Sequence, residues 1–133
     1  MKNIILSVLL LITEYCNGQY LKEIDSYIYY EVNSLTEEKT NFKGYEYKGY
    51  LVWYKDAFRI LINNRTVYTY RRIYQEDNQG LLSEYLLSIE GGNSANLVWR
   101  NSIDMVLFQT ESDENGSYLE FQFFLTSPMQ LIE

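Results

Sequence analysis

The strongest constraint on how this chain folds is an alternation of apolar and polar side chains that begins at Tyr45 and recurs toward the C-terminus. Successive side chains of a β-strand point to opposite faces, so a period of two is typical of strands with one buried face. Tyr118 to Leu125 is the clearest case, because its apolar side chains share one face: Leu119, Phe121, Phe123 and Leu125. The chain after Tyr45 is therefore predicted to be mainly β.

Short turn sequences separate the predicted strands. Lys55-Asp56 and Asn63-Asn64 follow two of them, and Asn115-Gly116 is the strongest hairpin signal in the chain. The strands expected before Tyr118 to Leu125 are Tyr45 to Tyr54 with a bend at Gly49, Phe58 to Ile62, Thr66 to Tyr74, Asn96 to Trp99, and Ile103 to Thr110 with Ile103, Met105 and Leu107 inward. Turns this short join antiparallel neighbours, which predicts a meander.

Two segments are harder to assign. Leu81 to Ile89 matches both a helix face and a strand face, and its length of nine residues and its neighbours favour a strand. Gln19 to Leu35 is predicted to be a helix, because apolar residues recur at spacings of three and four: Leu21, Ile24, Ile28, Val32 and Leu35. A strand through Tyr27 to Tyr30 is the competing interpretation, and Thr36 to Lys43 reads as a loop.

The predicted fold class is α+β and mostly β. An N-terminal helix precedes a curved antiparallel meander of about seven strands. Closing or curling such a sheet protects its edge strands, so a barrel or half-barrel is favoured over an open sheet.

Residues 1–18 have the form of a signal peptide, with Lys2 before the apolar run Ile4 to Ile12 and a polar end. The run is too short to span a bilayer, which takes about 20 residues. We expect cleavage before Gln19, a secreted or periplasmic protein, and a single domain over residues 19–133. The alternative is a lipid anchor through Cys16. Removal of the leader takes away the only cysteine, so the mature chain has no disulfide.

The composition excludes several chemistries. The 133-residue chain has no histidine, which excludes Ser-His-Asp catalysis, histidine-ligated zinc and a histidine pH switch. Its formal charge of -7 argues against a nucleic-acid partner, because binding phosphates requires clustered basic residues. The adjacent pair Arg71-Arg72 is expected on opposite faces of a strand. No cofactor or metal is predicted, although Glu111 to Gly116 partly matches a calcium loop, with Gln122 where an EF-hand needs glutamate.

Aromatic residues are the real excess, with 14 tyrosines, six phenylalanines and two tryptophans. Tyrosine has an apolar body and a polar tip, which suits half-wet positions in sheets and pockets. One hypothesis is a ligand cavity or a sugar-stacking platform made of Tyr50, Trp53, Tyr68, Tyr70 and Trp99. The alternative is that these rings only fill the core and favour strands.

Three segments carry a resemblance to known proteins. They are the leader ending in Asn17-Gly18-Gln19, the hairpin from Gly49 to Ile62, and the stretch from Asn101 to Thr110 with Met105-Val106-Leu107. With them the chain resembles small secreted bacterial proteins of unknown function that are lipocalin-like in architecture. Lipocalins carry Gly-x-Trp near the first strand, whereas here Gly49 precedes Trp53 by four positions. The resemblance implies an architecture and assigns no functional residue.

We therefore predict a secreted, non-enzymatic, β-rich binding or structural module with an unknown small ligand or protein partner. One alternative is an acidic inhibitor or immunity-type protein whose charge steers it to a basic partner. The other is a carboxylate-dependent hydrolase using Asp104 and Glu120, which flank the Asn115-Gly116 hairpin.

Overall fold

The computed structural model describes residues 20–63 and 65–130. The predicted signal peptide, with Cys16, lies outside these residues. The described part is built of strands and contains no helix. It accordingly offers no helix with the length and apolarity that crossing a bilayer requires.

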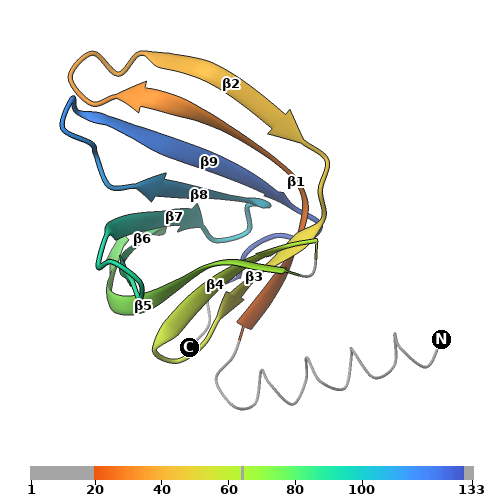
Figure 1. Ribbon diagram of the computed structural model, residues 1–133. Coiled ribbons are helices and arrows are strands. Elements are labelled where there is room, and N and C mark those ends of the chain that lie inside the picture. The colour runs from red at the N-terminus through yellow and green to blue at the C-terminus, as the bar shows by residue number, and fades with distance from the viewer. Residues whose placement is uncertain (1–19, 64, 131–133) are drawn as a thin grey trace, which may run out of the picture.

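Nine strands form one antiparallel sheet (Figure 1). They are β1 (Tyr20–Asn33), β2 (Lys39–Tyr45), β3 (Gly49–Trp53), β4 (Ala57–Ile62), β5 (Arg65–Asn78), β6 (Leu81–Ser88), β7 (Ser94–Arg100), β8 (Met105–Thr110) and β9 (Ser117–Leu125). The prediction of a mostly β, antiparallel fold is confirmed, and Leu81 to Ser88 is a strand.

The sheet closes on itself because β9 returns to β1. The β1–β9 ladder has nine residue pairs, from Ile24 opposite Leu125 to Asn33 opposite Ser117. Eight strands, β1 and β3 to β9, thus form a closed barrel. From β3 to β9 neighbouring strands are consecutive in the chain, whereas β2 lies between β1 and β3 in the sequence. β2 is an extra strand, and within the described residues it pairs only with the second half of β1.

The predicted helix over Gln19 to Leu35 is wrong, because residues 20–33 form β1. A β-bulge shifts the register of β1 against β9 between Ile24 and Ser26. As a result Ile24 and Tyr27, three positions apart, both reach the barrel interior. The helical pattern did not include Tyr27. Two of its members, Ile28 and Val32, are four positions apart, a spacing that fits one face of a strand as well as of a helix. Another member, Leu35, lies in the following turn and is 87% exposed.

The predicted loop from Thr36 to Lys43 is also wrong in part, since β2 begins at Lys39. β2 shows no alternation because nearly all of its residues are exposed, so no periodic signal could mark it. Its lysines, Lys39 and Lys43, are the kind of residue that discourages pairing of an exposed edge with another chain.

The core lies in the barrel interior and takes side chains from all eight of its strands and from the C-terminal segment. On β8 the inward residues are Val106 and Phe108, so the predicted inward set of Ile103, Met105 and Leu107 is wrong. Both faces of β8 are apolar, so the alternation alone does not indicate which face is buried. The fully buried Phe108 ring contacts Tyr70 at 5.3 Å, so the larger side chain lies inside.

The residues after β9 pack against the barrel near the start of β1 (Figure 1). Met129 is fully buried, and its backbone bonds to Ser102 and Ile103. The Lys22 ammonium donates hydrogen bonds to the Ser127 hydroxyl and the Pro128 carbonyl. The C-terminal segment thus supplies hydrogen-bond acceptors for the ammonium group of a buried lysine.

Gly49 is the position where β3 starts between two partners, Ile24 of β1 and Ile62 of β4. A Cβ atom there would lie 2.0 Å from the Leu61 carbonyl oxygen. That obstacle is backbone, so relief requires the strands to move apart.

Gly49→Ala is therefore expected to lower the free energy of unfolding by about 3 kcal/mol, the upper end for overpacking. Gly44→Ala is the matched control, because its Cβ would meet only Ile28 Cγ2 at 3.4 Å. Denaturant unfolding of both variants checks the prediction. Equal stability of the two would contradict it.

Candidate ligand-binding site

A cavity of about 630 Å³ lies between the barrel strands and is open to solvent on one side, where Tyr47 and Tyr68 are about half exposed. Four tyrosines and three phenylalanines dominate its wall: Tyr27, Tyr29, Tyr47, Tyr68, Phe108, Phe121 and Phe123. The remaining lining residues are Ile60, Ile62, Leu119, Asn63 and Arg65. We call this the aromatic cavity. Its volume falls within the range of about 300–1,000 Å³ that is typical of small-molecule sites.

Two bulges bring the lining residues to one face. The bulge in β1 turns Tyr27 and Tyr29 inward after Ile24. On β5 the register against β4 shifts, so that Tyr68 pairs with Ile60 while Arg65 pairs with Ile62. Arg65 and Tyr68 are three positions apart and would face opposite ways in a regular strand. The bulge places both on the cavity wall.

The aromatic rings form a continuous stacked series along the wall. Tyr29 is central, with its ring centroid 4.9 Å from that of Phe121 and 6.0 Å from that of Tyr45. Tyr45 continues to Tyr47 at 5.4 Å, and Phe121 continues to Phe123 at 5.8 Å. Offset stacking of this kind stabilises the wall and fixes the ring planes.

The phenol groups of the wall lie close enough to influence one another. Burial raises the pKa of Tyr27, and the neighbouring phenols of Tyr45, Tyr29, Tyr47 and Tyr68 raise it further. A hydrogen bond with Tyr29 raises the pKa of Tyr45. All these effects favour neutral phenols, so at neutral pH the wall presents O–H donors.

The structure separates the five residues of the predicted site. Tyr68 lines the aromatic cavity. Tyr70 is buried beneath it, with its ring 6.2 Å from Tyr68. Trp53 and Trp99 are buried in the core. Tyr50 lies on the face of β3 opposite the buried Leu51, and its hydroxyl is 3.5 Å from the Glu23 carboxylate.

Several lining residues were not predicted. Tyr27 and Tyr29 fell in the predicted helix, although the competing strand through Tyr27 to Tyr30 would have placed both on one face. Phe121 and Phe123 were expected on the apolar face of β9, and that face lines the cavity. Arg65 had no signal, because its place at the exposed edge of the cavity depends on the bulge in β5.

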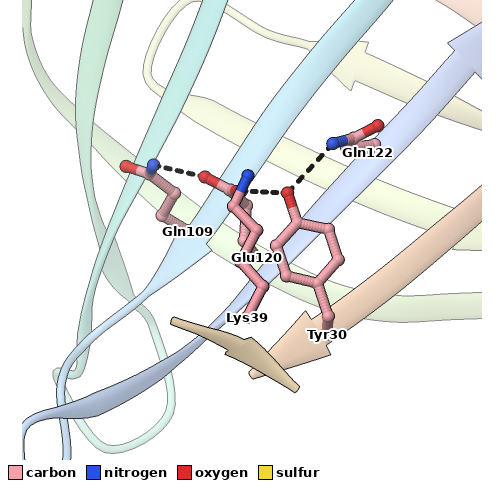
Figure 2. A network of polar contacts seen from close by, with 5 residues as sticks. All are labelled: Tyr30, Lys39, Gln109, Glu120 and Gln122. Atoms are coloured by element: carbon pink, nitrogen blue, oxygen red, sulfur yellow. Dashed lines mark hydrogen bonds and ion pairs between the residues drawn. The ribbon is translucent and has the colours of Figure 1, made fainter. Parts of the chain in front are cut away.

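A second cluster of polar residues lies where the second half of β1 is paired with β2 and with β9 (Figure 2). The buried Tyr30 hydroxyl donates a hydrogen bond to Glu120, and Gln109 donates to the other carboxylate oxygen at 2.7 Å. Gln122 donates to the Tyr30 oxygen at 2.9 Å, and Lys39 is 3.9 Å from Glu120. Both oxygens of the buried Glu120 carboxylate are therefore paired, and the Lys39 contact links β2 to this cluster.

This arrangement does not support the hydrolase hypothesis. Glu120 pairs with Gln109, whereas Asp104 precedes β8 and lies five positions before Gln109. At about 3.3 Å per residue the two acids are separated by about 16 Å along the strand. Glycosidase carboxylates lie about 5–9.5 Å apart.

A third cluster lies in the barrel interior, where Glu84 of β6 is 2% exposed. Arg72 binds one Glu84 oxygen and donates to the Tyr54 carbonyl at 2.7 Å. Arg71 is exposed, so this adjacent pair lies on opposite faces as predicted. Glu84 Oε2 and Trp99 Nε1 have no hydrogen-bond partner within the described residues.

The partial calcium-loop match has a structural explanation. Asp113 Oδ1 accepts hydrogen bonds from the backbone N–H groups of Asn115 and Ser117. Its carboxylate therefore shapes the hairpin turn. Across residues 20–63 and 65–130, no three acidic or thiol side chains gather as a metal ion would need.

Comparison of the chain with protein-family models, with curated proteins and with solved structures finds no match. The site must therefore be interpreted from its own geometry.

Tyr30 generates a prediction about alkaline pH. Burial and the hydrogen bond to Glu120 raise its pKa to about 12, and burial raises the pKa of Tyr70 to about 12. In the unfolded chain both phenols lose their protons near pH 10. The free energy of unfolding should hence be unaffected by these groups below about pH 10 and fall between about 10 and 12.

Tyr30→Phe should make this fall shallower, leaving the contribution of Tyr70. Urea unfolding at several alkaline pH values measures the slope, and phenolate absorbance of the native protein counts the late-titrating groups. An unchanged slope in Tyr30→Phe would refute the assignment.

The buried ion pair generates a prediction about stability. Arg72→Met leaves the Glu84 carboxylate buried without its cation, and should lower the free energy of unfolding by about 3 kcal/mol. The double variant Arg72→Met/Glu84→Leu should recover most of that loss, because no buried charge remains. Thermal and urea unfolding of both proteins provide the measurement. A double variant as unstable as Arg72→Met would contradict this account.

Proposed function

We propose that this protein binds a small, largely apolar ligand in the aromatic cavity. The observation that carries the proposal is a hollow of about 630 Å³ whose wall is dominated by aromatic rings. Transfer of an apolar ligand from water into such a site is favourable by about 25 cal/mol per Å² of apolar surface buried. The aromatic planes add offset-stacking contacts for a flat ligand.

The framework around the cavity favours binding without large rearrangement. Tyr27 and Tyr29 lie directly opposite Phe123 and Phe121 in the β1–β9 ladder. Ile60 and Ile62 lie on β4, which is paired on both sides by β3 and β5. Strands held on both edges keep the wall in place, which reduces the entropy lost on binding.

The chemistry of the wall supports binding more than catalysis. Apart from Arg65, the described lining residues contribute phenols and the amide of Asn63 as polar groups, and none of them contributes a carboxylate. The proposal is therefore a non-enzymatic carrier or sensor. Export, with the leader over residues 1–18, belongs to the proposal, and the closed barrel supports its lipocalin-like architecture. The alternative of an acidic inhibitor stays a hypothesis.

A neutral fluorescent probe, N-phenylnaphthylamine, tests the cavity. It should bind the protein with enhanced emission and quench part of the tyrosine fluorescence. Leu119→Trp places an indole into the cavity and should weaken binding at least tenfold.

Leu107→Trp is the matched control. It makes the same substitution on the opposite face of β8 from the buried Phe108, outside the cavity lining. Its probe affinity should equal that of the parent protein. Absence of probe binding to the parent, or equal binding by a folded Leu119→Trp variant, would exclude the proposed function.

A further inference from the structure

The aromatic cavity differs in charge from the acidic protein that surrounds it. The chain has 18 acidic and 11 basic residues, yet none of the described residues that line the cavity is an aspartate or a glutamate. Among these described lining residues, Arg65 is the one that carries a charge. An apolar site inside an acidic protein thus carries a single positive group.

The backbone position of Arg65 is well defined. It is the first residue of β5 and pairs with Ile62, the last residue of β4. The two-residue connection between them contains Asn63 with φ of 51°, a left-handed conformation that asparagine tolerates in tight hairpins. The Asn63 N–H also donates to the Lys48 carbonyl at 3.0 Å. The turn is therefore anchored to the segment between β2 and β3.

The Arg65 side chain is exposed at the edge of the aromatic cavity. Within residues 20–63 and 65–130 the ion pairs involve Lys39, Lys48 and Arg72, and none involves Arg65. The chain has more carboxylates than basic side chains, so the sequence offers enough acidic residues to pair with Arg65. Its position beside an apolar hollow instead leaves five N–H donors available to a ligand.

We propose that the ligand is an amphipathic anion. Its apolar body occupies the aromatic cavity, and one carboxylate, sulfonate or phosphate group binds Arg65 at the edge of that cavity. This inference rests on the proposed function. Asn63 lies beside Arg65 and offers an amide N–H, and the neutral phenols of the wall can donate O–H groups to the same anion.

The net charge of the protein limits which of its groups can attract an anion. A formal charge of -7 repels anions at long range, so the surface as a whole gives no general affinity for them. Any preference for an anion must then come from a local group. Lys43 lies opposite Tyr29 in the β1–β2 ladder, which adds a second positive charge on the face of the sheet that carries the stacked aromatic series.

A matched pair of probes tests the head group. Anilinonaphthalene sulfonate has the skeleton of N-phenylnaphthylamine with one added sulfonate. Arg65→Gln should reduce the ratio of sulfonate affinity to neutral-probe affinity about fivefold to tenfold, the size expected for a charge-assisted hydrogen bond that is partly exposed. Arg65→Lys should restore part of that ratio, because the charge returns without the planar fork.

Arg71→Gln is the control, because it removes the same charge from an exposed position on the same strand. Its ratio should match that of the parent protein. If the parent protein does not bind the neutral probe, the proposed function itself is excluded. Neutral-probe binding with an unchanged ratio in Arg65→Gln, or an equal fall in Arg71→Gln, would overturn the anion inference and leave the cavity as a site for neutral ligands.

Discussion

The β1–β9 ladder is the interaction on which the rest of the structure depends. It joins the first described strand to the last and converts an open meander into a barrel. The same ladder sets Tyr29 opposite Phe121 and Tyr27 opposite Phe123, so the stacked wall of the cavity exists only when the barrel is closed. On the other face it sets Tyr30 opposite Glu120, which places the buried carboxylate beside its donor.

The two faces of this ladder have different energetic characters. The inner face contributes apolar surface and leaves a hollow, which is a loss of packing that a ligand can recover. The outer face buries a charge, and it is stable only because Tyr30 and Gln109 both donate to Glu120. A satisfied polar network beside the ladder therefore holds β1 and β9 together where the core beneath them is incomplete.

The strands from β3 to β9 could be predicted because one face of each is buried and turns punctuate them. β1 could not, since the bulge after Ile24 replaces a period of two by a spacing of three, and β2 could not because it is exposed on both faces. The face of β8 was ambiguous because both of its faces are apolar. Arg65 illustrates the limit most clearly: its position at the exposed edge of the cavity depends on a register shift in β5 that composition and periodicity do not encode.

The long sequence separation of the closing ladder has a kinetic consequence. Tyr30 and Glu120 are 90 residues apart, so their pairing requires most of the chain to be ordered first. Folds dominated by such distant contacts form slowly, in milliseconds to seconds. The cavity wall comes from both partner strands, so a partly folded chain has no site to offer. A ligand then binds only the closed barrel and stabilises it by mass action, which makes occupancy a signal that folding is complete.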